Sequence, residues 1–238
     1  MSTNSDAPTE KRARLAGEAA RAEGYAEQRR AMVEEQIRDR GVHSPRVLEA
    51  MLAVPRHLFV PEDYVAGAYS DQPLPIGEGQ TISQPYMVAV MTEALELTGN
   101  ERVLEVGTGS GYQAAVLSLL AAEVYTIENH ASLALAARQR LAQLGYTNVH
   151  VHAGDGTLGF PGAAPYGGIV VTAAAPKIPP PLVEQLAEGG RLVIPVGQAD
   201  QQELLQVRKT GGKTTSGLLH YCRFVPLVGR YGWQNLHG

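Results

Sequence analysis

Three glycines at alternate positions form the strongest chemical signal in the sequence, in the stretch "VLEVGTGSGY". Gly107, Gly109 and Gly111 follow an apolar run and precede a helical segment, with Thr108 between the first two. Because glycine has no side chain, the backbone can approach a ligand closely there, and the N–H groups at the start of the helix are free to bind it. The spacing differs from the G-x-G-x-x-G of dinucleotide sites, because Tyr112 stands in place of the third glycine. The loop therefore predicts a ligand other than a nicotinamide dinucleotide.

Three acidic residues accompany this loop, one inside the first strand and two at the ends of the strands that follow. Glu105, inside the first strand, disfavours a phosphate and suits a ligand that carries a cationic amine. Glu128 closes the next strand, about 20 residues after the loop begins, where a carboxylate accepts both ribose hydroxyls. Asp155, followed by Gly156, closes the third strand, where a carboxylate can accept from an adenine amino group. Taken alone, Asp155 fits an ordinary turn as well as it fits a binding site, and Glu128 fits a solvated strand end equally well. Together they favour S-adenosyl-L-methionine as cofactor, with S-adenosyl-L-homocysteine as product.

The elements that must position these residues alternate between strand and helix. Five short β-rich runs, separated in part by helical segments, predict an α/β fold with a doubly wound, mostly parallel sheet covered on both faces. The β-rich runs are 102–107, 123–128, 149–155, 167–174 and 189–197, and the helical segments are 112–122, 131–145 and 179–190. Residues 203–210 and 217–227, joined by "GGKTTS", predict an antiparallel hairpin at the sheet edge.

Two N-terminal helices precede the sheet. The first is expected over 26–41 with a stop at Gly41, and the second over 44–54 with Ser44 as N-cap and Pro45 at its first position. We expect residues 1–24 to form a flexible or helical extension and residues 25–238 to form a single domain. Within it, 25–98 would supply the N-terminal helices and a substrate-side segment, and 99–238 the cofactor-binding sheet.

The composition excludes several classes of protein. The 238 residues are 44% apolar and carry a net charge of −4, which gives no support for binding nucleic acid or an anionic membrane. The one cysteine, Cys222, excludes an internal disulfide and is more typical of a small core residue than of a nucleophile. Without a spanning run or an apolar leader, we expect a cytoplasmic protein, and the scattered histidines indicate no metal site.

A serine without a basic partner lies in the stretch "QTISQPYMVAVMTEAL". Ser83 precedes Pro85, the expected start of a helix, and no histidine stands beside it in the sequence. By position alone, Ser83 is expected to cap this helix. A role in binding or catalysis is the alternative, and the two roles are compatible.

From about residue 28 to 235 the sequence resembles the protein-L-isoaspartate O-methyltransferase family. The most specific segment is "AYSDQPLPIGEGQTISQPYMVAVMTEAL", and "PRHLFVP", "GDGTLGF", "TAAAPKIP", "GGRLVIPVG" and "RFVPLVG" are also similar to family segments. The resemblance implies methylation of the α-carboxylate of L-isoaspartyl residues in damaged proteins and peptides, which starts their repair. It also implies that Ser83 is the active serine and that Gln80, Thr81 and Ile82 line the cofactor and substrate.

The chemistry of such a transfer explains the missing base. A peptide carboxylate has a pKa of about 3.5, so it is already ionised at neutral pH. It needs only to be placed about 3 Å from the methyl carbon and in line with the C–S bond. We therefore expect the Ser83 hydroxyl to donate a hydrogen bond to the far carboxylate oxygen, with the backbone of Thr81 to Ser83 binding the substrate main chain.

Two positions depart from the family pattern. Gly167 replaces an aspartate that often begins the fourth strand, which affects packing or weakens the pocket. Val228 replaces a polar residue found in some relatives near the substrate, and we expect it to border the substrate. A small-molecule or RNA methyltransferase on the same fold and a non-catalytic cofactor-binding protein are the rival interpretations. We expect a monomer or a weak oligomer.

Overall fold

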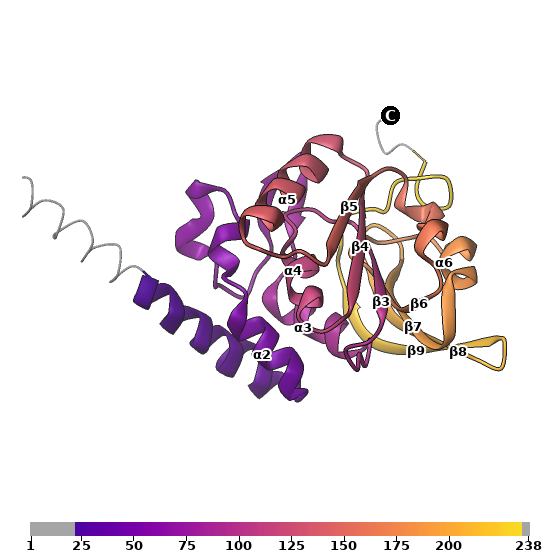
Figure 1. Cartoon of the computed structure of the whole chain (residues 1–238), viewed down its shortest axis with the longest axis horizontal. Helices are drawn as coiled ribbons and strands as arrows, with labels where there is room; N and C mark the ends of the chain where they lie inside the picture. Colours follow the sequence, from indigo (N-terminus) through magenta and orange to yellow (C-terminus); the bar gives the residue numbers. More distant parts are fainter. Residues whose placement is uncertain (1–21, 235–238) are drawn as a thin grey trace, which may run out of the picture.

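A seven-stranded sheet organises the computed structural model, which describes residues 22–234 (Figure 1). Its strand order is β5-β4-β3-β6-β7-β8-β9. The strands from β5 to β7 in this order are parallel to one another. At the other edge, β8 pairs antiparallel with β7 and β9 pairs antiparallel with β8. The predicted doubly wound sheet with an edge hairpin is therefore confirmed. The strands are β3 Arg102–Val106, β4 Glu123–Glu128, β5 Val149–Ala153, β6 Tyr166–Val171, β7 Leu186–Gly197, β8 Gln202–Thr210 and β9 Lys213–Cys222.

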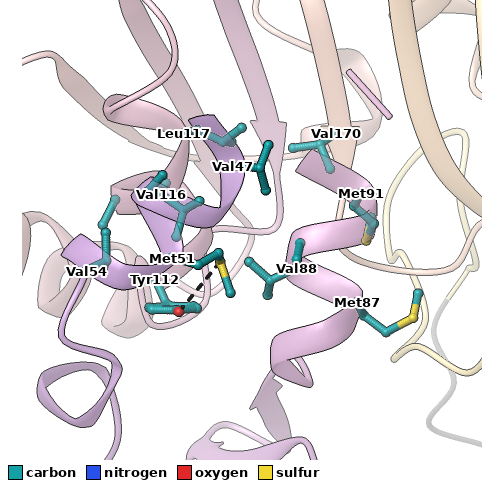
Figure 2. Packing of buried hydrophobic residues seen from close by; sticks show 14 of the residues in the cluster. Val47, Met51, Val54, Met87, Val88, Met91, Tyr112, Val116, Leu117 and Val170 are labelled. Atoms are coloured by element: carbon teal, nitrogen blue, oxygen red, sulfur yellow. Dashed lines mark hydrogen bonds between the residues drawn. The ribbon is translucent and has the colours of Figure 1, made fainter. Parts of the chain in front are cut away.

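Helices cover the two faces of the sheet unequally. One face carries α2 Pro45–Ala53, α3 Pro85–Glu93, α4 Tyr112–Ser118 and α5 Ala131–Gln143, whereas α6 Pro180–Glu184 lies on the other (Figure 1). Figure 2 shows how α2, α3 and α4 pack together through Met51, Val88 and Val116, and Val170 of β6 belongs to the same cluster. Because these side chains are at most 1% exposed, this cluster fixes the helices against the strands.

The N-terminal helix runs further toward the N-terminus than the sequence predicted. Residues 22–31 are α-helical, a π-helical turn follows over Met32–Ile37, and a 3₁₀ turn covers Arg38–Arg40. Gly41 ends the helix with a φ of +100°, which confirms the predicted stop. Residues 22–24 of the expected extension belong to this helix, and residues 1–21 lie outside the described part of the chain.

The N-cap residue predicted for α2 is in place, but its side chain does not form the predicted hydrogen bond. Ser44 occupies the N-cap position, but its side chain makes no capping hydrogen bond. Instead, the Glu93 carboxylate accepts from the backbone N–H groups of His43 at 2.8 Å and Ser44 at 2.6 Å. Glu93 therefore binds the backbone that leads into the helix, and the contact ties the first helices to the segment that follows Ser83.

Before α3 the chain forms a short antiparallel pair, β1 Leu74–Gly77 and β2 Gln80–Ile82. Two 3₁₀ turns precede it, Arg56–Phe59 and Glu62–Gly67, so the long irregular stretch is packed structure. Gln84 is the N-cap of α3, and Ser83 lies one residue before it. The expectation that Ser83 caps this helix is therefore wrong.

Three element boundaries differ from the sequence prediction. The third helical segment ends at Glu184 as α6, and the predicted helical residues from Leu186 belong to β7. The last strand, β9, ends at Cys222 rather than 227, and its hairpin turn is reduced to Gly211 and Gly212. Within residues 22–234, none of the helices combines the length and the apolar character needed to cross a membrane.

Candidate functional site

The carboxyl ends of β3, β4 and β6 border a cavity of about 460 Å³, which we call the glycine-loop cavity. The loops after these strands form one side of it. The turn between β1 and β2 and the segment 225–228 form the other. Ligands of open α/β sheets bind in this position, outside the strand ends where the chain order reverses. β3 is such a switch point, since its neighbours are β4 and β6.

The glycine loop leaves room that no other residue would leave. Gly107 has a φ of +99°, and a Cβ atom there would lie 2.3 Å from the Thr172 hydroxyl oxygen. That hydroxyl donates to the Gly107 carbonyl at 2.7 Å, which fixes the loop against β6. Gly109 also lines the cavity, with a φ of +51°. Gly111 does not line it, because a Cβ there would face Leu141 at 3.2 Å, so this glycine serves the approach of α4 to α5.

Glu128 is a buried carboxylate that lines this cavity. It ends β4 and is 6% exposed. One of its oxygens accepts from the Gly109 N–H at 2.8 Å and the other from the His130 N–H at 3.0 Å. A carboxylate oxygen has two lone pairs, so each oxygen keeps one for a ligand. The two free acceptors suit a pair of adjacent hydroxyl groups.

Glu105 lies beneath the loop and not on the cavity wall. Its side chain is fully buried, and one oxygen accepts from the Thr126 hydroxyl at 2.6 Å. Thr126 in turn shares a hydrogen bond of 2.6 Å with the Thr108 hydroxyl, so Thr108 belongs to this buried network. The second oxygen of Glu105, Oε1, has no partner among the described residues. A direct contact between Glu105 and an ammonium group stays a prediction.

Burial raises the pKa of Glu105 to about 8, the Thr126 hydrogen bond opposes this rise, and the Glu128 charge adds to it. From its usual value of 4.5 up to about 8, the folded protein keeps a proton that the unfolded chain has released. The free energy of unfolding therefore falls as pH rises through this window. We expect Glu105→Gln to make the free energy of unfolding, measured by urea denaturation, less dependent on pH between pH 5 and 8.5. Glu184→Gln, at an exposed position, should leave the slope unchanged, and an unchanged slope in Glu105→Gln would contradict the assignment.

Asp155 and Gly156 are placed differently from each other. Gly156 lines the cavity, where a Cβ would lie 2.5 Å from a methyl group of Val106. The Asp155 carboxylate is not part of the lining. It accepts from the N–H of Thr157 at 2.9 Å, from the hydroxyl of Thr157 at 2.6 Å and from the N–H of Arg230 at 2.8 Å. Asp155 thus anchors the C-terminal segment that walls the cavity, and its contact with an adenine amino group stays a prediction.

Ser83 lies in a second, adjoining cavity of about 610 Å³, which we call the Ser83 cavity. Four residues line both cavities, and they mark the passage between them: Thr81, Thr172, Val225 and Pro226. Ser83 is half-buried, and within residues 22–234 no hydrogen bond involves its hydroxyl. Its carbonyl oxygen accepts from Arg56 Nη2 at 2.8 Å. The hydroxyl is therefore free to bind a ligand beside the glycine-loop cavity.

The neighbours of Ser83 on β2 divide between the two cavities and the core. Thr81 is exposed to both cavities, and Gln80 lines the glycine-loop cavity while its amide donates to the Glu78 carbonyl at 3.2 Å. The Ile82 side chain is 4% exposed, packs in the hydrophobic core and lines neither cavity. Only the backbone of Ile82 remains available for the predicted contact.

The two positions that depart from the expected pattern lie at opposite ends of the sheet. Val228 lines the glycine-loop cavity and not the Ser83 cavity, and its predicted contact with the substrate stays a prediction. Gly167 stands near the start of β6, where a Cβ would lie 2.6 Å from the Glu101 side chain. Gly167 therefore permits packing against Glu101 at the end of the sheet that is remote from both cavities.

Several lining residues were not singled out from the sequence. Thr172 lies within the fourth β-rich run and lines both cavities, but an isolated threonine gives no local signal. Arg40, Tyr86 and His220 line the Ser83 cavity from three distant segments. Cys222 also lines it and is half-buried, with a pKa that burial raises to about 11, so it is less of a core residue than predicted. Among residues 22–234, no group of His, Cys, Asp and Glu is arranged to hold a metal ion.

Comparisons with known proteins agree on one family. Residues 27–232 match the family model described as protein-L-isoaspartate(D-aspartate) O-methyltransferase. A protein-L-isoaspartate O-methyltransferase from Methanoregula boonei is 55% identical over 210 residues, which cover 88% of this chain and 97% of that relative. One from Geobacter metallireducens is 58% identical over 206 residues, covering 86% and 95%.

Solved structures share the fold. A protein-L-isoaspartate O-methyltransferase structure matches with a TM-score of 0.79 and 30% identity, over 86% of this chain and 67% of that one. A structure from Plasmodium falciparum in complex with S-adenosyl-L-homocysteine matches with a TM-score of 0.71 and 24% identity, over 83% and 97%.

Proposed function

The chain belongs to the protein-L-isoaspartate(D-aspartate) O-methyltransferase family, and we propose on this premise that Ser83 positions the substrate carboxylate for methylation. The protein is an S-adenosylmethionine-dependent enzyme that methylates the α-carboxylate of L-isoaspartyl residues in damaged proteins and peptides. One observation carries the residue assignment. The free hydroxyl of Ser83 lies in a cavity that shares Thr81 and Thr172 with the glycine-loop cavity.

The glycine-loop cavity fits the cofactor. S-adenosylmethionine supplies an electrophilic methyl group on a sulfonium. Gly107 and Gly156 line this cavity, and neither position has room for a side chain, because a Cβ would collide with Thr172 or Val106, so the cavity wall there is backbone. The two free acceptors of Glu128 would hold the ribose hydroxyls. Burial raises the pKa of Glu105 to about 8, so this side chain is mostly protonated at neutral pH, and its partnerless oxygen lies beneath the loop. Val228 and Pro226 would cover the ligand from the C-terminal side.

The residues around Ser83 have to orient the substrate, not activate it. The isoaspartyl carboxylate is ionised at neutral pH, with a pKa of about 3.5, so no residue needs to remove a proton. Its oxygen must approach the methyl carbon in line, and the Ser83 hydroxyl would donate to the other oxygen to hold that direction. Because the opposite charges of the reacting groups cancel, a site that excludes water favours the transfer. Thr81 and Thr172 stand at the passage where the two reacting groups would meet.

The rival interpretations lose their support in this arrangement. The case for a non-catalytic binding protein depended on Gly167 and Val228. Gly167 packs against Glu101 far from both cavities, and Val228 is compatible with an apolar wall of the cofactor site. A small-molecule or RNA methyltransferase has no need for the Ser83 cavity, whose lining includes residues from six separate segments of the chain.

A paired-peptide assay tests the function. We expect methyl transfer from S-adenosylmethionine to a peptide with one L-isoaspartyl residue, and transfer at least 100-fold slower to the same peptide with normal aspartate, because a geometric mismatch at the reacting atom costs about 10²-fold. Alkaline release of methanol from the product would identify a carboxyl ester. Equal rates on the two peptides, or cofactor binding without ester formation, would contradict the proposal.

The finer expectations on partners and organisation stay proposals. The net charge of −4 supports substrates other than nucleic acid, and the single cysteine is compatible with a cytoplasmic location. We propose a monomer or weak oligomer that forms one methyltransferase domain with an N-terminal extension. The boundary predicted at residue 24 falls inside the helix that the structure describes from residue 22. Sedimentation of the purified chain would test the oligomeric state.

A further inference from the structure

We propose that Arg56 is a positioning residue that sets the orientation of Ser83 by holding its peptide carbonyl, an inference that rests on the proposed role of Ser83. Arg56 begins the 3₁₀ turn Arg56–Phe59 and is 0% exposed. It lines neither cavity, so it acts on the reaction through Ser83 and not by touching a ligand.

The guanidinium of Arg56 links two segments that no strand or helix joins. Its Nε donates to the Ala68 carbonyl at 2.7 Å, and its Nη2 donates to the Ser83 carbonyl at 2.8 Å. These acceptors are 12 and 27 residues away along the chain. Because a guanidinium is planar and its donors form a rigid fork, two such bonds fix direction as well as distance.

The same guanidinium also contacts the first residue after the glycine loop. Its Cζ lies 4.9 Å from the ring centroid of Tyr112, which begins α4 and is 1% exposed. Arg56 therefore lies between the segment that carries Ser83 and the helix that follows the cofactor loop. A single rigid group sets the spacing between the two halves of the proposed active site.

The group stays charged despite its burial. Burial lowers the pKa of Arg56 to about 10, while the nearby Tyr112, Tyr69 and Asp71 act in the opposite direction. At neutral pH the side chain is protonated, and its Nη1 has no partner among the described residues. Burying a cation with an unpaired donor is costly, and apolar residues usually fill such places with equal or better stability. The free-energy cost of burying this cation is consistent with Arg56 serving to fix the geometry of the Ser83 peptide.

Ser83 depends on this support because its neighbours provide little. β2 ends at Ile82 and α3 begins at Pro85, so the Ser83 peptide lies between two elements. A displacement of about 1 Å at a positioning group can cost about 10²-fold in rate. Loss of the Arg56 fork should therefore slow the chemical step more than it weakens cofactor binding.

A double-mutant cycle tests the coupling. Arg56→Lys keeps the positive charge but replaces the fork by a point donor, and it is combined with Ser83→Ala. Arg46→Lys is the matched control, because Arg46 also donates to two backbone carbonyls, those of Leu97 at 2.6 Å and Leu120 at 3.3 Å, and lines neither cavity. The measurements are kcat and KM for an isoaspartyl peptide, the Kd of S-adenosyl-L-homocysteine and the thermal midpoint.

We expect Arg56→Lys to lower kcat about tenfold or more while the Kd of S-adenosyl-L-homocysteine stays within about threefold of the wild-type value. In the Ser83→Ala background the same change should lower kcat less than twofold. Arg46→Lys should leave kcat unchanged in both backgrounds. The inference would be overturned if Arg56→Lys lowered kcat by the same factor in the Ser83→Ala background as in the wild type. It would also be overturned if Arg56→Lys lowered the thermal midpoint and left kcat unchanged.

The cycle separates this inference from the proposed function. If Ser83→Ala alone retains full activity, the role of Ser83 fails and the inference falls with it. If Ser83→Ala is impaired and the Arg56 effect is independent of it, only the inference fails. Should Arg56→Lys not fold, the cycle is repeated with Arg56→Gln, which keeps one NH₂ donor without the buried charge, and the same pattern of kcat values is required.

Discussion

Replacing Glu128 by alanine is expected to raise the dissociation constant of S-adenosyl-L-homocysteine about 100-fold or more. Two hydrogen bonds from ribose hydroxyls to a carboxylate contribute about 1.5–3 kcal/mol each, and each 1.4 kcal/mol corresponds to a factor of ten in affinity. The substitution also removes the acceptor for the Gly109 and His130 N–H groups, which loosens the glycine loop itself. Both effects act on the cofactor, so the affinity should fall before any effect on the peptide appears.

Calorimetric titration with S-adenosyl-L-homocysteine measures this loss. Glu123→Ala is the matched control, because Glu123 begins the same strand β4 and its carboxylate contacts His150 at 2.6 Å, at the end remote from the cavity. The dissociation constant of Glu128→Gln should lie between those of Glu128→Ala and Glu123→Ala, since an amide keeps one acceptor oxygen. A Glu128→Ala protein that binds within about threefold of the wild type would remove Glu128 from the ribose site.

Local sequence was sufficient for the residues that the strands place directly. Gly107 and Glu128 follow adjacent parallel strands, and parallel strands bring their carboxyl ends to one edge whatever the rest of the chain does. The structure brings the two together, and it adds a hydrogen bond that was not predicted, from the Gly109 N–H to Glu128 at 2.8 Å. The roles proposed for them in binding a cofactor are for the titrations above to decide.

Tertiary contacts decided what the sequence did not predict. Asp155 has the right place after a strand, but one oxygen of its carboxylate accepts from the Arg230 N–H, from 75 residues away in the C-terminal segment. Glu93 accepts from the Ser44 N–H from 49 residues away, and Arg56 donates to the Ser83 carbonyl from 27 residues away. No local pattern encodes such partners. β7 begins early because Tyr166 pairs with Leu186, which overrides the helical pattern of that segment.

Replacing Ser83 by alanine is expected to lower kcat for an isoaspartyl peptide by about an order of magnitude or more, with cofactor affinity unchanged. The substitution removes one hydrogen bond to a charged oxygen, which contributes about 1.5–3 kcal/mol, and with it the constraint on the direction of attack. Cofactor affinity should persist because Ser83 lines only the second cavity. Ser44→Ala is the matched control, since Ser44 also precedes a helix without capping it.

The pH dependence separates orientation from activation. A carboxylate that only has to be held in place is ionised throughout pH 6–8.5, so the ratio of wild-type to Ser83→Ala rates should stay constant over that range. An activated serine would instead need a base, and the ratio would follow that base. His220 lines the same cavity, but its Nδ1 is paired with the Tyr221 carbonyl at 2.8 Å and its ring packs against Tyr86. A rate ratio that changes with pH in the wild-type background and becomes constant in His220→Gln would show that Ser83 is activated, and the steering role would be wrong.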